Sequence, residues 1–216
     1  MKILCITDLH DSTKALTRIL ADAGPVDLIL LGGDITHFGT PDDAERLVRR
    51  AGETGARVLA VAGNCDSAAI DRRLTGLGVS LSGRGVMIEN VGLHGLPAMP
   101  PWGHTMYQFT EEEFAGMLEA GYAQVDGAAS HVVLSHAPPR GGTLDRTHLF
   151  QHVGSTALRA FIDEKQPGLV LCGHIHESRG VEKSGCTTIA NCGAGGRRYY
   201  AIAEVGDKME VELCRA

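Results

Sequence analysis

Side chains that bind metal ions stand directly after five apolar runs of the sequence. The runs cover residues 2–7, 28–31, 57–62, 132–135 and 169–172, and each has about the length of a strand. The polar residues that follow them are Asp8 and His10, Asp34, Asn64, His136, and His174 and His176. Ligands of open α/β sheets bind at the carboxyl ends of the strands. Because carboxylate, amide and imidazole groups suit Mn, Fe, Zn or Ni, the pattern predicts a metal site.

The spacing of these residues favours more than one ion. Residues i and i+2 of an extended chain point to the same side, so Asp8 can converge with His10, and His174 with His176. The seven candidate ligands are too many for one tetrahedral ion. Two ions that share a bridging carboxylate would use the whole set.

Helix-like stretches separate the strand-like runs. They cover residues 12–23, 41–52, 111–120 and 155–165, and Thr40-Pro41 is a typical helix start. Residues 79–96 have the pattern of a hairpin, and residues 187–191, 199–205 and 209–214 that of successive antiparallel strands. This order predicts an α/β fold with mixed sheets. A length of 216 residues predicts one domain over residues 1–216.

The order of these motifs resembles that of the calcineurin-like metallophosphoesterase superfamily. The matching motifs are Asp8-x-His10, Gly33-Asp34, Gly63-Asn64-x-Asp66, His136 and Gly173-His174-x-His176. The GNCD sequence and the short chain look most like the small bacterial and archaeal phosphodiesterase branch. The resemblance implies a four-layer α/β/β/α sandwich with two mixed β-sheets. It also implies a first metal ion held by Asp8, His10, Asp34 and His176, and a second held by Asp34, Asn64, His136 and His174.

The resemblance further implies a hydrolase of phosphoester bonds. In such enzymes a metal-bridging hydroxide attacks phosphorus directly, so the expected catalytic residues are Asp34, Asn64 and His136, acting through that hydroxide. We expect small phosphodiesters as substrates, with phosphomonoesters as a second class. The expected cofactor is two Mn²⁺ ions, although the ligands also suit Fe, Ni, Zn and Mg. The alternative function is a scaffold or binding protein of this fold, but a scaffold does not need seven metal ligands.

Cys65 departs from the family pattern, because most members have at this position a histidine that acts as general acid. A cysteine thiol is shorter and, with a pKa of about 8.5, a weak donor. The expected hydroxide takes the role of nucleophile, and seven other residues saturate two metal sites, so neither role is favoured for Cys65. We interpret it as a small residue that leaves room for substrate, and Asp66 as the cap of the next helix.

Other polar residues are candidates for proton donation or substrate contact. The candidate substitute acids are His37 and His94, followed by His104, His148 and His152. An arginine beside glycines can clamp an anionic oxygen, which makes Arg140 a candidate for substrate binding, together with His94. Arg197 and Arg198 are further candidates, and Asn191 is predicted to line the same cleft.

The composition excludes some classes of protein. A net charge of −6 and a pI of about 5.9 argue against bulk nucleic-acid binding, and therefore against a DNA-repair nuclease of the same superfamily. No apolar run approaches the roughly 18 residues of a membrane span or has the form of a signal peptide, so we expect a cytoplasmic protein without a membrane partner. Six cysteines without a Cys-x-x-Cys pair indicate reduced, mostly buried thiols. A homo-oligomer is compatible with the sequence.

Overall fold

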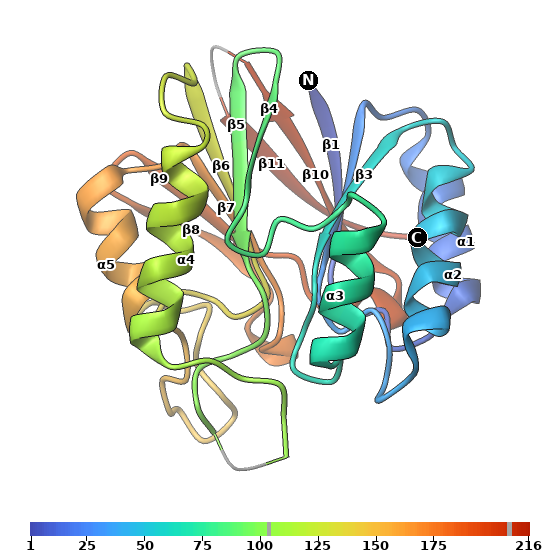
Figure 1. Cartoon of the computed structure of the whole chain (residues 1–216), viewed down its shortest axis with the longest axis horizontal. Helices are drawn as coiled ribbons and strands as arrows, with labels where there is room; N and C mark the ends of the chain where they lie inside the picture. Colours follow the sequence, from blue (N-terminus) through green and yellow to red (C-terminus); the bar gives the residue numbers. More distant parts are fainter. Residues whose placement is uncertain (103–104, 207–208) are drawn as a thin grey trace.

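Two β-sheets face each other in the middle of the molecule (Figure 1). The computed structural model describes residues 1–102, 105–206 and 209–216. The first sheet has the order β11 (Met209–Arg215), β10 (Tyr199–Val205), β1 (Lys2–Ile6), β2 (Leu28–Gly32) and β3 (Arg57–Val61). The second has the order β4 (Gly85–Ile88), β5 (Val91–Leu96), β6 (Ser130–Ser135), β7 (Leu169–Cys172), β9 (Thr187–Asn191) and β8 (Gly180–Ser184). Each contains parallel and antiparallel pairs, so both sheets are mixed.

Helices cover the outer faces of both sheets (Figure 1). The helices α1 (Thr13–Ala23), α2 (Pro41–Gly52) and α3 (Ala68–Gly76) pack on the first sheet. The helices α4 (Glu111–Ala123) and α5 (Thr156–Lys165) pack on the second. The order of layers is therefore α/β/β/α, which confirms the predicted sandwich. Among the described residues, no helix combines the length and the apolar character that crossing a bilayer requires.

The apolar runs of the first sheet are continuous because its central strands are buried on both faces. In β1, Ile3 and Cys5 lie in the core between the sheets, whereas Leu4 and Ile6 pack against the helices. The same alternation holds through β2. Strands that are covered on both sides are typically apolar throughout. Each fully buried Leu or Ile contributes roughly 1.5–3 kcal/mol to stability.

Capping side chains determine where the helices begin. The Thr40 side chain accepts a hydrogen bond from Asp43 N, and the Asp43 carboxylate accepts one from Thr40 N, with Pro41 in the first turn of α2. This reciprocal pair satisfies backbone donors that have no partner inside the helix. Ser12 caps α1, where its side chain accepts a hydrogen bond from Ala15 N.

The C-terminal strands differ from the prediction. The strand β9 does not pair with β10, because it lies parallel to β7 and antiparallel to β8 in the second sheet. The strand β8 was not predicted; it is a half-exposed edge strand whose residues include Glu182 and Lys183. Only β10 and β11 return to the first sheet, as an antiparallel pair. The predicted hairpin within residues 79–96 is present as β4 and β5.

Loops at the carboxyl ends of both sheets meet at one end of the molecule. After β1, Asp8 N donates to Gly33 O at 2.9 Å, which joins the loops that follow β1 and β2. After β7, Gly173 N donates to His136 O at 3.0 Å, which joins the loops that follow β7 and β6. The polar residues that follow these strands therefore share one region.

Candidate metal centre

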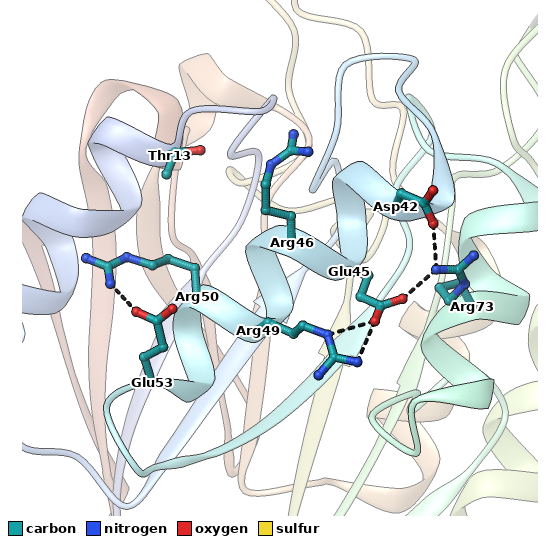
Figure 2. Close-up of a pocket in the computed structure, with 8 residues that line it drawn as sticks. All are labelled: Thr13, Asp42, Glu45, Arg46, Arg49, Arg50, Glu53 and Arg73. Atoms are coloured by element: carbon teal, nitrogen blue, oxygen red, sulfur yellow. Dashed lines mark hydrogen bonds and ion pairs between the residues drawn. The ribbon is translucent and has the colours of Figure 1, made fainter.

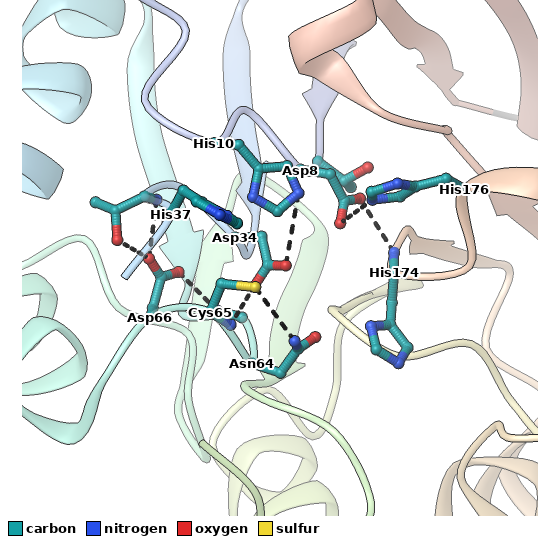
Figure 3. A network of polar contacts seen from close by, with 12 residues as sticks. Asp8, His10, Asp34, His37, Asn64, Cys65, Asp66, His174 and His176 are labelled. Atoms are coloured by element: carbon teal, nitrogen blue, oxygen red, sulfur yellow. Dashed lines mark hydrogen bonds and ion pairs between the residues drawn. The ribbon is translucent and has the colours of Figure 1, made fainter. Parts of the chain in front are cut away.

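The structure brings the seven predicted metal ligands together, and Figure 3 labels all of them except His136. In the first set, Asp8 Oδ1 lies 3.1 Å from His176 Nε2, and one ligand atom from each of Asp8, His10 and His176 lies within 4.8 Å of the others. His10 Nε2 lies 3.8 Å from Asp34 Oδ2. Asp34 therefore connects the first set to the second.

The second set gathers around the buried imidazole of His136. Its Nε2 lies 2.8 Å from Asn64 Oδ1 and 3.5 Å from Asp34 Oδ1. Its Nδ1 lies 2.9 Å from the carbonyl oxygen of Gly32, which accepts a hydrogen bond when Nδ1 carries the proton. A bond of this kind orients a metal-binding imidazole and leaves the other nitrogen as the ligand. The His174 ring lies 5.0 Å from the His136 ring, measured between centroids.

Four of the predicted ligands have left-handed backbone conformations. The φ angles are 55° for Asp8, 46° for His10, 46° for Asp34 and 65° for His174. Such angles are uncommon outside glycine and cost roughly 1–3 kcal/mol each, so they persist only where the surrounding structure enforces them. Their concentration at one place indicates a functional site.

Two glycines allow the loops of the centre to approach closely. A Cβ atom on Gly63 would overlap the backbone nitrogen and the carboxylate of Asp34. A Cβ atom on Gly33, whose φ is 87°, would overlap the ring of His136. Only glycine leaves space for Asp34 and His136 in their observed positions.

The charges of the centre favour bound cations. Burial raises the pKa of Asp8, but the hydrogen bond from His176 and the charges of His136 and His176 outweigh burial and lower it to about 2. Burial lowers the pKa of His136, but the charges of Asp34 and Asp8 outweigh burial and raise it. A proton on His136 thus compensates for buried carboxylates, as a divalent ion would. The residues therefore fit the metal centre that the ligand types predict.

Asp66 has a different role from the predicted one. Its carboxylate accepts hydrogen bonds from Ile35 N, Thr36 N, Thr36 Oγ1 and Gly63 N at 2.8–3.1 Å. The cap of α3 is Ser67, so the prediction for Asp66 was wrong. Burial raises the pKa of Asp66 to about 6, against the hydrogen bonds that stabilise its charge. Asp66 joins the loops after β2 and β3, which carry Asp34 and Asn64.

His37 lies at the edge of the centre, next to Cys65. Its ring centroid is 5.3 Å from that of His10, and its side chain is exposed. Cys65 is buried, and its backbone N donates to Asp34 Oδ1 at 2.7 Å. Burial and the charge of Asp34 raise the pKa of the Cys65 thiol. The structure thus brings one of the two leading candidate acids, His37, to the centre.

The other leading candidate, His94, is not part of the centre. It is fully buried on β5, where its ring lies 5.3 Å from Phe161 and 6.1 Å from Tyr122. Along β5, Leu93 points into the core between the sheets, so His94 points to the opposite side, toward α4 and α5. Contact with substrate is incompatible with this position, which corrects the prediction for His94.

Most of the remaining candidates for proton donation or substrate contact lie away from the predicted ligands. Arg140 is exposed and joined to Ser155 and Arg159 through its backbone, and no ion pair of the described residues joins its guanidinium to the ligands. His148 and His152 pair with acidic residues, Glu177 and Asp145, and Arg198 lies in the turn after Arg197. His104 lies outside the described residues.

Arg197 lies next to the centre, in the short helix η2 (Gly195–Arg197). The hydrogen bond with Asp8 raises the pKa of His176, and the charge of Arg197 is near enough to oppose this rise.

Asn191 supports the loop that carries His174 and His176. It is fully buried, and its Nδ2 lies 3.3 Å from Gly173 O and 2.9 Å from Ile175 O, as a donor to both. These carbonyls flank His174 and precede His176. Asn191 therefore holds the loop of these two ligands and does not line a cleft, in contrast to the prediction.

A hollow on α2 lies apart from the ligands (Figure 2). Its arginines pair with acidic residues: Arg46 with Asp43, Arg49 with Glu45, Arg50 with Glu53, and Arg73 with both Asp42 and Glu45. Exposed pairs of this kind contribute little to stability and leave no excess of positive charge for an anion. We assign no binding site to this hollow.

The fold and the two joined ligand sets define a metallophosphoesterase. The chain belongs to the calcineurin-like phosphoesterase family, whose sequence model matches residues 1–178. An uncharacterized protein of Methanocaldococcus jannaschii is 33% identical over 198 residues, which cover 88% of this chain and 87% of that protein.

Solved structures share the fold at low sequence identity. A protein of Thermus thermophilus has a TM-score of 0.78 at 17% identity, with 99% of this chain and 98% of that chain covered. A dimetal phosphatase of Danio rerio has a TM-score of 0.68 at 12% identity, with 99% and 95% covered. At these identities the likeness shows the fold alone.

Proposed function

We propose that this protein hydrolyses small phosphodiesters, and phosphomonoesters as a second class, at a centre of two divalent ions. The proposed ions are Mn²⁺. The observation that carries the proposal is the position of Asp34. Its Oδ2 faces His10 of the first set, and its Oδ1 faces His136 of the second. From this position Asp34 could bridge two ions, which supports the proposal.

The predicted ligands orient and hold the ions of such a centre. Bound in pairs, divalent ions generate a nucleophile from water near neutral pH and neutralise charge on phosphoryl oxygens. His136 directs Nε2 inward, because Nδ1 faces Gly32 O. Burial and the nearby charge of His136 lower the pKa of His174 to about 3, which keeps its ring neutral and able to ligate.

Two residues outside the ligand sets support substrate turnover. His37 lies beside Cys65, where most family members have their acid, and supplies the proton to the leaving oxygen. Arg197 is held next to the centre, since Gly196 N donates to Asp8 O at 2.9 Å, and its charge attracts a substrate phosphate.

A panel of substrates with reconstituted metals tests the proposal. Protein stripped of metal and reloaded with Mn²⁺, Fe²⁺, Ni²⁺, Zn²⁺ or Mg²⁺ is assayed on aryl and alkyl phosphodiesters and phosphomonoesters. We expect hydrolysis with Mn²⁺, and for Asp34→Asn a loss of at least about 100-fold, because the loss of a ligand exceeds the 10–100-fold effect of removing a residue that supports one. If wild type and Asp34→Asn are equally inactive with every metal, the scaffold alternative is favoured.

A further inference from the structure

A third cluster of metal-binding side chains lies beside the two predicted sets. One ligand atom from each of His10, His37 and Cys65 lies within 4.8 Å of the other two. Figure 3 shows the His37 side chain beside those of His10 and Cys65, which lie on either side of Asp34 in this view. The cluster shares only His10 with the first set, and neither His37 nor Cys65 belongs to the predicted centre.

The second ring nitrogen of His10 is available as a ligand for this cluster. Its Nε2 faces Asp34 Oδ2, whereas its Nδ1 is buried without a hydrogen-bond partner in the described part of the chain. A buried polar atom without a partner costs about 1–3 kcal/mol. The second nitrogen of a metal-binding histidine is almost always hydrogen-bonded. His10 lacks that bond, so its second nitrogen can bind an ion.

The ligand types of the cluster differ from those of the main centre. The main centre combines four imidazoles with carboxylate and amide oxygens from Asp8, Asp34 and Asn64 and includes no thiol, so it also suits hard ions. The cluster offers one thiol and two imidazoles, and this combination selects Zn²⁺ or Cu⁺. Three protein ligands leave the fourth position of a tetrahedral ion for water.

We propose that His10, His37 and Cys65 form a binding site for a thiolate-preferring ion such as Zn²⁺. Zinc bonds of about 2.0–2.3 Å place tetrahedral donors within about 4 Å of one another. Rotation of the exposed His37 side chain closes the remaining gap, and the same exposure gives the ion a path from solvent. When the ion binds while His10 Nε2 holds an ion of the first set, the Cys65 thiol and His10 Nδ1 each release a proton to solvent, and His10 bridges the two ions as an imidazolate.

The consequence for turnover rests on the proposed function. An ion in this site is coordinated by His37, the proposed proton donor, and prevents it from donating a proton. Zn²⁺ added to the Mn²⁺-loaded protein therefore slows the hydrolysis of alkyl diesters more than that of aryl diesters, whose leaving groups need little protonation. The site itself is tested without turnover.

Cobalt(II), which takes zinc sites and gives a thiolate charge-transfer band in the near ultraviolet, is the probe. Mn²⁺-loaded wild type is titrated with Co²⁺, and we expect a saturable band that Zn²⁺ removes. Cys65→Ser abolishes the band, and His37→Ala weakens Co²⁺ binding by at least about tenfold. Cys186→Ser, which removes an exposed cysteine elsewhere, keeps the band and is the matched control.

The proposal is overturned if wild type shows no band, or if Cys65→Ser keeps it. Circular dichroism checks that Cys65→Ser is folded, and if it is not, unchanged Co²⁺ affinity of His37→Ala overturns the proposal instead. A protein that hydrolyses phosphodiesters with Mn²⁺ but shows no band refutes only this site. A band without hydrolysis refutes only the proposed function.

Discussion

At the scale of single residues, Cys65 determines the surroundings of the proposed leaving group. The buried thiol has a raised pKa and is a poor proton donor. His37, three positions after Asp34, reaches the same place from the neighbouring loop. In the proposed mechanism, His37 supplies from this loop the proton that Cys65 does not.

His37→Gln should separate substrates by leaving group. General acid catalysis contributes about 10²–10⁴-fold, and a stable aryl oxide barely needs it. We expect kcat/KM to fall by about 100-fold or more for alkyl diesters and to change little for aryl diesters, in Mn²⁺-loaded protein free of zinc. The control is His148→Gln, an exposed histidine beside Glu177, which should leave both rates unchanged. An equal fall for both substrates would show that His37 binds substrate and does not donate a proton.

At the scale of elements, the loop after β7 depends on the strand β9. Asn191 ends β9 and anchors the backbone on both sides of His174. The parallel pairing of β7 with β9 places Asn191 opposite Cys172, directly before that loop. The strand order of the second sheet therefore positions two metal ligands.

Asn191→Ala should weaken metal binding while the fold is kept. The variant leaves Gly173 O and Ile175 O without their donor, so the loop of His174 and His176 is less well held. Supports of this kind are worth about 10–100-fold in metal affinity, and we expect a loss in that range by calorimetric Mn²⁺ titration. Thr188→Ala, a change of a buried polar residue on the same strand, should keep the affinity. Unaltered Mn²⁺ binding by Asn191→Ala would remove this residue from the centre.

At the scale of the whole molecule, a buried histidine makes stability depend on pH. Burial, aided by the charge of His131, lowers the pKa of His94 from 6.5 to about 4. The unfolded chain then binds more protons than the folded chain between these two values. His94 should therefore cost no stability above pH 6.5 and destabilise the fold progressively as the pH falls to about 4, by up to about 3 kcal/mol.

His94→Leu should remove this dependence. We expect the difference between the urea midpoints of variant and wild type to be constant above pH 6.5 and to shift in favour of the variant as the pH falls toward 4. The neighbouring His131 and Tyr122 remain in the variant, and the pKa of His131 is lowered too, so part of the acid destabilisation persists. A constant difference between the two proteins from pH 8 to pH 4 would contradict the prediction.

Both the fold class and the residues that meet at the candidate metal centre could be predicted from the sequence. Apolar runs covered on both faces are visible as uninterrupted hydrophobic stretches, and the residue after each run lies by necessity at a carboxyl strand end. Asp8, Asp34, Asn64 and His136 are predictable for that reason. Helix starts such as Thr40-Pro41 depend on contacts within four residues, so they too are visible in the sequence.

Only the tertiary structure decided the contacts between segments far apart in the chain. The bonds of Asp66 to the loop after β2, the support from Asn191 and the burial of His94 depend on which strands are neighbours and which face each one covers. No local pattern carries that information, and β9 was predicted beside the wrong strands. The sequence alone determined which groups could bind metal. The order of the strands determined which of these groups meet, because pairing between strands brings their side chains together.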